Sequence, residues 1–191
     1  MKSKIIDYLN KSIKTKQSIL DKQTDVIENI VKAIVDCLKN NNKILIFGNG
    51  GSAADAQHMS AELVGRFEME REPLPVIALT INTSILTAVA NDYGYDEVFT
   101  RQLKAFAKKG DIAIGITTSG SSKNVVKAIE LATQMNVTTI AFTGGAGSPI
   151  NDLADISFVA ESDYTPVIQE AHITVIHIIC KLVEEELFGN V

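Results

Sequence analysis

The sequence predicts an α/β fold in which a five-stranded parallel sheet is flanked by helices on both faces. Short apolar runs alternate with stretches of helical periodicity over most of the chain. Several of these runs end in glycine or hydroxyl residues, as buried strands often do where they turn into helices. Such alternation is typical of parallel strands with right-handed crossovers, so we expect ligands to bind beyond the carboxyl ends of the strands.

Composition limits both the class of protein and the compartment. With 191 residues, 46% hydrophobic and 21% charged, the chain is long enough to bury one good core. A net charge of −5 and a pI near 5.2 give no general basic face for nucleic acid or an anionic membrane. Cys37 and Cys180 lie far apart in apolar helical patterns, which predicts buried thiols. No stretch reaches roughly 18 apolar residues, so we expect a soluble cytoplasmic protein that contacts neither a membrane nor, directly, nucleic acid.

Residues 1–42 are predicted to form an amphipathic helical arm ahead of the first strand. Apolar residues recur there at spacings of three and four, over residues 5–13 and again over 27–38, which indicates one long helix or two shorter ones. The remaining residues, 43–191, are expected to form a single α/β domain. An arm of this length can cover its own sheet or pack on another subunit, and its length favours a contact between subunits.

The stretch KILIFGNGGSAADAQHMSAELVGR, residues 43–66, is the feature around which the chain is organised. Its first five residues have the branched apolar character of a buried parallel strand. Gly48, Gly50 and Gly51 then permit a tight turn that side chains would block. Ser52 is expected to cap the following helix, whose first N–H groups point back over the loop. A helix end of this kind attracts anions, phosphate above all.

His58 and Glu62 lie four residues apart on this helix and therefore share one face. Either side chain could reach a ligand held at the mouth of the helix. The alternative is a solvated ion pair on a capped helix, which is the commoner meaning of a single H-x-x-x-E pattern. The Gly-rich loop directly before the helix favours a functional site, because two independent parts of one site then coincide.

The chain continues with a strand, the start of a helix, a turn and another helix. In order, these are residues 76–81, 82–84, 91–95 and 95–109. Asn91 and Asp92 fall in the predicted turn. Because Asn and Asp are common turn formers, a purely structural role for these two residues has the same weight as a role in binding.

A second junction between a strand and a helix carries hydroxyl groups. The strand 112–117 runs into the segment TTSGSS, residues 117–122, and the helix 123–135 follows. Hydroxyls around one glycine at a helix start can surround phosphate oxygens with donors, although a Ser/Thr-rich loop is often only a capping segment. Neither junction has the P-loop or the G-x-G-x-x-G pattern, so a nucleotide is not the first expectation.

The last part of the chain is predicted to hold two strands and a long apolar helix. The strands are residues 137–143, closed by a Gly-rich turn at 144–149, and 156–160, with a short helix at 149–154 between them. The helix 165–188 is apolar over most of its circumference, so we expect it to be buried between this domain and a neighbour. His172 and His177 stand out in it, and taken alone each is best interpreted as a buried histidine satisfied by one hydrogen bond.

Four segments of the sequence carry a resemblance to a known family. They are GNGGSAADAQHMSAELVGRF, AVANDYGYDEVF, GITTSGSSKNVVKAI and IQEAHITVIHIICKLVE, and they follow one another at the expected distances. From the arm to its end, the chain resembles the sugar isomerase (SIS) domain proteins of the phosphoheptose isomerase type. The resemblance implies that family's fold, a flavodoxin-like three-layer sandwich. It also implies a homo-oligomer, expected to be a tetramer, in which neighbouring chains line each site.

The resemblance assigns an expected role to each matching residue. Glu62 and His177 match the catalytic acid–base pair. Val167 stands where many relatives have a basic residue, which puts in doubt a role for this position in substrate charge. The implied substrate-binding residues are Asn49, Gly50, Gly51, Ser52, Glu62, Asn91, Asp92, Thr117, Thr118, Ser119, Ser122 and Gln169. The positions that hold one Zn²⁺ per subunit in some relatives are His58, Glu62, Gln169 and His177.

The implied reaction converts D-sedoheptulose 7-phosphate to D-glycero-D-manno-heptose 7-phosphate through an enediol(ate), the first step of bacterial heptose biosynthesis. Moving a proton between C1 and C2 needs one group that acts on carbon and one that acts on the oxygens, which a carboxylate near a histidine supplies. The alternatives are a non-catalytic SIS protein that binds the replication initiator DnaA and a sugar-phosphate sensor. Glu62 argues against the sensor, because a carboxylate repels a bound phosphate.

Overall fold

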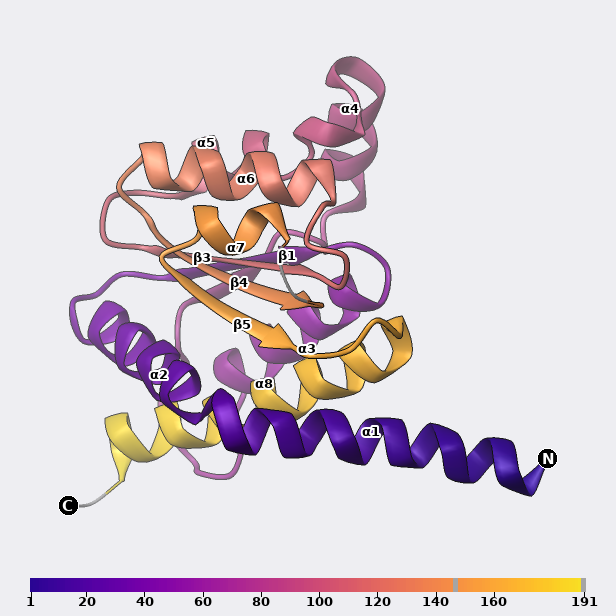
Figure 1. Cartoon of the computed structure of the whole chain (residues 1–191). Helices are drawn as coiled ribbons and strands as arrows, with labels where there is room; N and C mark the ends of the chain where they lie inside the picture. Colours follow the sequence, from indigo (N-terminus) through magenta and orange to yellow (C-terminus); the bar gives the residue numbers. More distant parts are fainter. Residues whose placement is uncertain (146–147, 190–191) are drawn as a thin grey trace.

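The computed structural model describes residues 1–145 and 148–189, so the turn predicted at 144–149 lies partly outside the described residues (Figure 1). The strands are Ile44–Gly48 (β1), Val76–Ala78 (β2), Ile112–Thr117 (β3), Thr138–Gly144 (β4) and Ile156–Ala160 (β5). The helices are Lys2–Lys22 (α1), Thr24–Lys39 (α2), Gly51–Val64 (α3), Thr83–Tyr93 (α4), Thr100–Phe106 (α5), Lys123–Gln134 (α6), Pro149–Leu153 (α7) and Thr165–Phe188 (α8), with a 3₁₀ turn at Tyr95–Glu97 (η1).

The five strands form one sheet in the order β2-β1-β3-β4-β5, and every neighbouring pair is parallel. This confirms the predicted fold class. β1 and β3 are neighbours, with Gly48 opposite Ile116. The loops that follow these two strands therefore leave the same edge of the sheet side by side, although 64 residues separate Gly48 from Ile112 at the start of β3.

Helices cover both faces of the sheet, which gives three layers (Figure 1). On one face, α2, α3 and α8 pack through a buried cluster that includes Ile34, Met59 and Val175. On the other face, α5 and α6 pack through a second cluster that includes Phe99 and Ile129. Successive side chains along a strand point to opposite faces of the sheet. Ile44 and Ile46 of β1 therefore belong to the first cluster, and Leu45 and Phe47 to the second.

The N-terminal segment forms two helices, one of the two forms predicted, with the break at Gln23. α2 contributes its apolar face to the cluster that it shares with α8 and the sheet. α1 projects past the body of the domain (Figure 1). It is tied to α8 by Glu170, which accepts hydrogen bonds from the Tyr8 hydroxyl at 2.6 Å and the Ser12 hydroxyl at 2.5 Å.

Two local predictions around helix ends are wrong. Ser52 does not cap α3, because Gly50 adopts a left-handed φ of 56° and starts the helix earlier, so that Ser52 is buried within its first turn. The segment predicted as a turn at 91–95 is helical up to Tyr93. Gly94, with φ of 89°, ends that helix, as a glycine with a positive φ commonly does.

Two elements between β1 and β3 are shorter than predicted. β2 ends at Ala78, whereas the predicted strand continued to residue 81. The helix predicted at 95–109 is a 3₁₀ turn followed by α5, which ends at Phe106 with that side chain exposed. The start of α4 is as predicted, with the Asn82 side chain accepting a hydrogen bond from the Ile85 N–H.

α8 has the length and apolarity that a membrane-spanning helix requires, with a mean hydropathy of 1.3 over 18 residues. It does not contain the run of roughly 18 apolar residues that the sequence was expected to lack, because Gln169, Glu170 and Lys181 interrupt it. Half of that window is buried inside the fold, and α8 packs on the sheet with α2 and α3. The core helix of a globular domain produces the same signal, and this is how α8 is used here.

His172 is a fully buried histidine, as predicted for it. Its Nε2 lies 3.0 Å from the Thr143 carbonyl oxygen, and its ring makes edge-on contacts with Phe142 and Phe158. Nδ1 is buried with no hydrogen-bond partner in the described residues. Burial lowers the pKa of His172 from 6.5 to about 4, and the hydrogen bond with Thr143 opposes this shift only in part. His172 is therefore neutral in the folded protein at neutral pH.

We predict that His172 makes the fold sensitive to mild acid. The unfolded chain binds the proton at the ordinary pKa of 6.5, whereas the folded chain does not bind it until about pH 4. The free energy of unfolding should therefore fall by about 3 kcal/mol as the pH drops through this window, and this contribution should be constant below it. Urea titrations of the wild type and His172→Gln across this range measure the effect. Equal pH dependence in both proteins would contradict the assignment.

Candidate active site

The Gly-rich loop after β1 brings backbone and side-chain donors to the edge of the sheet. Gly50 takes up the left-handed conformation that starts α3. A Cβ added at Gly51 would overlap the amide end of the Gln169 side chain, which would then have to move. Gln169 belongs to the first turns of α8. The loop predicted to bind substrate and one residue of the predicted zinc set are therefore in contact.

His58, Glu62 and His177 converge between α3 and α8. Nε2 of His58 lies 2.9 Å from Nε2 of His177 and 3.1 Å from Oε1 of Glu62. One imidazole must donate to the other, because each neutral ring has one N–H and one acceptor nitrogen. The Glu62 side chain is 24% exposed and that of His58 43% exposed, so solvent or a ligand can reach the group. The interpretation of His177 as a buried histidine is thus wrong, since it is half-buried in this cluster.

The hydroxyl loop after β3 forms the second part of the site. Oγ1 of Thr117 lies 3.0 Å from Oγ of Ser122 and 3.4 Å from Oγ of Ser119. The Ser121 N–H and hydroxyl both point to Oγ of Ser119. Ser122 stands at the N-cap of α6, whose first backbone N–H groups face the same loop. Hydroxyl groups that bond to one another here can rotate toward the oxygens of a bound anion.

A side-chain network that the sequence analysis missed joins the two loops. Asn49 and Asn124 exchange amide hydrogen bonds of 2.9 Å in both directions. The Tyr95 hydroxyl also donates to Oδ1 of Asn49, at 3.0 Å. Asn49 in the Gly-rich loop is therefore fixed by the first turn of α6 and by η1. The position of Asn124, two residues after the end of the hydroxyl loop, is the one sequence signal that could have indicated this contact.

Asn91 and Asp92 lie exposed in the last turn of α4, and the Asn91 amide donates to Oδ1 of Asp92 at 2.8 Å. These two side chains bond to each other and not to the Gly-rich loop or the hydroxyl loop. The contact between this segment and the Gly-rich loop is made instead by Tyr95. The structure thus brings Asn49, Gly51 and Gln169 together at the loop but leaves the predicted pair at Asn91 and Asp92 outside this set of contacts.

Asp55 lies one turn before His58 on α3 and is half-buried. Burial raises the pKa of the Asp55 carboxyl to about 6, and the nearby His58 lowers it by a smaller amount. Its Oδ2 is buried with no partner in the described residues. The sequence analysis did not single out this residue, because its unusual environment depends on packing.

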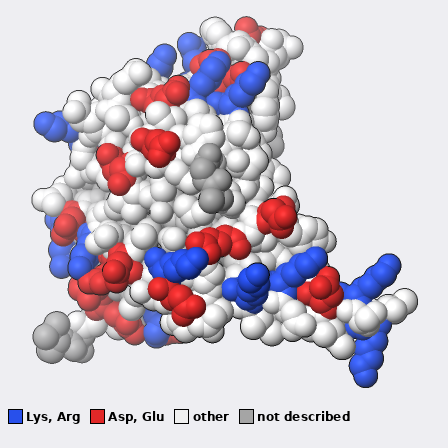
Figure 2. Space-filling view, in the orientation of Figure 1, with Lys and Arg blue, Asp and Glu red and all other residues white. Residues whose placement is uncertain are grey.

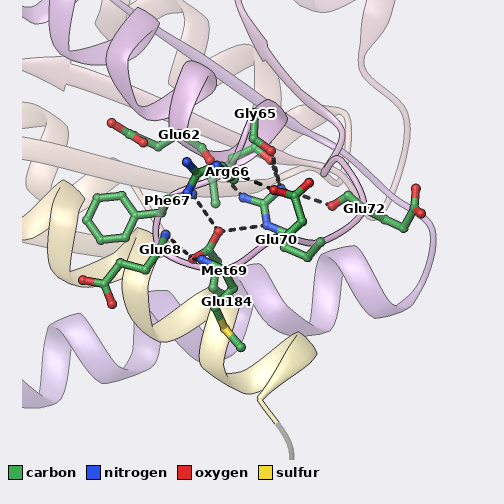
Figure 3. Close-up of polar contacts among 11 residues, drawn as sticks. Glu62, Gly65, Arg66, Phe67, Glu68, Met69, Glu70, Glu72 and Glu184 are labelled. Carbon is green, nitrogen blue, oxygen red and sulfur yellow. Dashed lines mark hydrogen bonds and ion pairs between the residues drawn. The ribbon is translucent and has the colours of Figure 1, made fainter.

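A buried ion pair lies at the other end of the α3–α8 contact (Figure 3). Arg71 and Glu184 are each 1% exposed, and Nε of Arg71 lies 2.9 Å from Oε1 of Glu184. The sequence analysis did not identify this pair either. Its members are 113 residues apart, and no local pattern indicates that they meet.

The donor set at His58, Glu62, Gln169 and His177 suits Zn²⁺ chemically, since it holds two imidazoles, one carboxylate and one weak amide oxygen. The two imidazole nitrogens are 2.9 Å apart, whereas two nitrogens on one tetrahedral zinc ion are about 3.3 Å apart. Within the described chain, no three His, Cys, Asp or Glu side chains are already arranged around one ion. Binding would therefore need a small separation of His58 from His177.

The chain is similar over most of its length to proteins of one known family. Residues 7–144 match the family model described as the SIS domain. The chain is 50% identical over 177 residues to a phosphoheptose isomerase of Geotalea daltonii, covering 93% of this chain and 92% of the relative. Among solved structures, the phosphoheptose isomerase of Neisseria gonorrhoeae superposes with a TM-score of 0.91 at 37% identity, covering 96% of this chain and 98% of that one. That of Francisella tularensis gives 0.92 at 39% identity, covering 96% and 97%.

Proposed function

The chain belongs to the phosphoheptose isomerase family of SIS-domain proteins, and on this premise we propose how its residues catalyse the reaction. It is an aldose–ketose isomerase that interconverts D-sedoheptulose 7-phosphate and D-glycero-D-manno-heptose 7-phosphate. The observation that supports this proposal best is the convergence of Glu62, His58 and His177. The helix α3, which carries His58 and Glu62, and the hydroxyl loop follow two neighbouring strands that end at the same edge of the sheet.

The phosphate of the substrate binds to the hydroxyl loop in this proposal. Thr117, Thr118, Ser119 and Ser122 supply hydroxyl donors, and the start of α6 supplies backbone N–H groups. All of these donors are neutral, so the loop binds a dianion through hydrogen bonds and the helix dipole rather than through a lysine or arginine. A phosphate held there acts as a handle that places the other end of the sugar near α3 and α8.

Glu62 and His177 then divide the proton transfers. Glu62 removes the proton from C1 of the ketose, and the electron pair of that C–H bond forms the C1–C2 double bond of the enediol(ate). His177 delivers a proton to the C2 oxygen and accepts one from the C1 oxygen. Return of the proton from Glu62 to C2 gives the aldose, so the sum of the steps neither adds nor removes a proton. His58 lies against both groups and limits their movement.

Zinc belongs to the proposal as a bound cofactor, one ion per subunit. His58, Glu62, Gln169 and His177 would hold it, by the chemistry of the donor set described above. When bound, Zn²⁺ supplies a Lewis acid that polarises the substrate carbonyl.

The alternative functions have less support. The relatives described above are named for isomerase activity, and none of them supports the alternative of DnaA binding. A cytoplasmic location agrees with a sugar-phosphate substrate, and we include it in the proposal. The product is an entry to bacterial heptose, which serves lipopolysaccharide, capsule or another glycan.

We further propose that the protein is a homo-oligomer, with the tetramer of the family resemblance as the expected form. Five large apolar side chains on α1 are each about half exposed or more: Ile5, Ile6, Leu9, Ile13 and Leu20. Exposed apolar area on this scale is typical of contacts between proteins. Figure 2 shows α1 projecting from the body, with basic, acidic and uncharged groups interspersed along it. A second copy of the chain is the occupant that the family resemblance favours.

Glu62→Gln should keep the fold and the affinity for substrate but lose nearly all turnover. The amide fills almost the same volume and cannot accept the proton from carbon, and loss of a general base typically costs about 10² to 10⁴ in rate. Steady-state kinetics with sedoheptulose 7-phosphate measure kcat. Near-normal turnover in the purified variant would remove Glu62 from the mechanism.

Replacing both Thr118 and Ser119 by Ala should raise KM more than it lowers kcat. Each lost hydrogen bond to the charged phosphate costs about 1.5 to 3 kcal/mol in affinity. The same kinetic assay separates the two parameters, and Ser84→Ala, an exposed hydroxyl at the start of α4, is the control. A fall in kcat with unchanged KM would show that the loop does not bind phosphate in the ground state.

Purified wild-type protein should bind close to one zinc ion per chain, and His58→Ala should bind much less. Loss of one imidazole leaves a set with too few strong ligands. Metal analysis after dialysis against a weak chelator measures the content without reference to activity. Cys37→Ala is the control, because Cys37 is a potential zinc ligand that lies outside the set. Equal zinc content in His58→Ala and wild type would contradict the assignment.

Dilution that dissociates the oligomer should abolish activity and leave the helical content largely intact. The reason is that neighbouring chains are expected to complete each site, whereas the core of each domain is formed within one chain. Light scattering, circular dichroism and activity measured on the same dilution series test this. Leu9→Glu should dissociate at a higher concentration than the wild type, because it places a charge on the exposed face of α1. A fully active monomer at micromolar concentration would disprove it.

A further inference from the structure

The segment between α3 and β2 is held by one buried carboxylate. Glu184 on α8 accepts hydrogen bonds from the backbone N–H groups of Phe67, Glu68 and Met69 at 2.8 to 3.1 Å. Burial by itself raises the pKa of Glu184, but these three hydrogen bonds and the charge of Arg71 outweigh it, so the pKa is lowered. The carboxylate is therefore charged and has its acceptor positions filled.

Arg71 connects this carboxylate to the C-terminal end of α3. Figure 3 labels Glu62, Gly65 and Glu184, the residues that these contacts join. Nε donates to Glu184, and Nη1 donates to the carbonyl oxygens of Leu63 at 2.7 Å and Gly65 at 3.1 Å. Nη2 donates to the carbonyl oxygen of Glu62 at 2.9 Å. The last carbonyl groups of a helix have no partner within the helix and carry its negative end. The Arg71 guanidinium therefore caps the C-terminal end of α3 and also balances the negative charge of Glu184.

The same residue, Glu62, supplies both the catalytic carboxylate and a carbonyl bound by Arg71. Glu184 lies seven residues after His177 on α8, which is two turns further along the same face, about 10 Å away. Two bridges therefore join α3 to α8. One is the contact of His58 on α3 with His177 on α8. The other runs through Arg71, which bonds to the last carbonyl groups of α3 and to Glu184 on α8.

We propose that Arg71 and Glu184 are positioning residues, which set the position of Glu62 relative to His177. This inference rests on the proposed function, because it assumes that Glu62 and His177 carry the proton transfers. Neither Arg71 nor Glu184 needs to touch the substrate. Their fully satisfied hydrogen bonds fix the end of α3 on α8, and a misplacement of about 1 Å in an active site can cost about 10²-fold in rate.

Arg71→Lys is the variant that separates positioning from folding. Lysine keeps a positive charge beside Glu184, but its single ammonium cannot reach that carboxylate and the carbonyls of Glu62, Leu63 and Gly65 together. We expect kcat to fall about 10²-fold, with KM within about 3-fold of the wild-type value, because the hydroxyl loop is on β3 and α6. The melting temperature should stay well above the assay temperature.

A second variant covers the case in which Arg71→Lys does not fold. The double variant Arg71→Gln with Glu184→Gln leaves no net charge in the interior, and both amides can still form hydrogen bonds. It should show the same loss of kcat with KM preserved. The matched control is Lys181→Met, which removes an exposed ion pair of 2.6 Å with Glu68 between the same helix and the same segment. The control should leave kcat unchanged.

The outcomes separate the two claims. If the wild type does not turn over sedoheptulose 7-phosphate, the proposed function fails. If the wild type is active and the folded Arg71 variants keep its kcat, the positioning role is wrong. A loss of kcat that disappears when the assay is run further below the melting temperature would also overturn it, because the pair would then serve stability alone. A loss of kcat in the folded variants at every temperature, with KM and the control unchanged, supports the proposal.

Discussion

The packing of α8 against α3 beneath one face of the sheet is the contact on which the candidate site depends. α8 is apolar enough to pass through the core, yet it carries Gln169, His177 and Glu184 toward α3 at intervals of about two turns. Burial of a charged pair such as Arg71–Glu184 is costly unless every donor and acceptor is satisfied, and removing one partner of such a pair typically destabilises a protein by about 3 to 5 kcal/mol. Here the hydrogen bonds to α3 and to segment 67–69 satisfy both groups.

The parallel sheet supplies the second constraint, because it places the ends of β1 and β3 together. The Gly-rich loop and the hydroxyl loop then meet through Asn49 and Asn124. In the proposed function, neutral donors on one side bind the phosphate and a carboxylate–imidazole group on the other transfers the protons. This arrangement suits a protein with a net charge of −5, since the anion is attracted by local dipoles and not by the overall charge.

The sequence predicted what depends on local pattern and missed what depends on distant packing. β3, β5 and α8 begin and end at the predicted residues, because apolar periodicity and flanking polar residues mark them clearly. Ser52 was misjudged because the left-handed Gly50 moved the helix start, and residues 91–93 were misjudged because turn-forming residues can also end a helix before a glycine. Arg71–Glu184 and Tyr95–Asn49 join separate elements, so single-sequence patterns could not indicate them. The roles of Glu62 and His177 came from family resemblance, and the structure adds that His58 lies within hydrogen-bonding distance of both.

In the proposed function, the group between α3 and α8 transfers a proton between neighbouring carbons of a sugar phosphate. Turnover of sedoheptulose 7-phosphate in D₂O, followed by NMR of the product, tests this most directly. An enediol(ate) route through Glu62 predicts deuterium at C2 of the heptose 7-phosphate, because the carboxyl proton can exchange with solvent before it returns to carbon. A product that forms at the normal rate with no deuterium at C2 would contradict the account, since the hydrogen would then have moved directly from carbon to carbon.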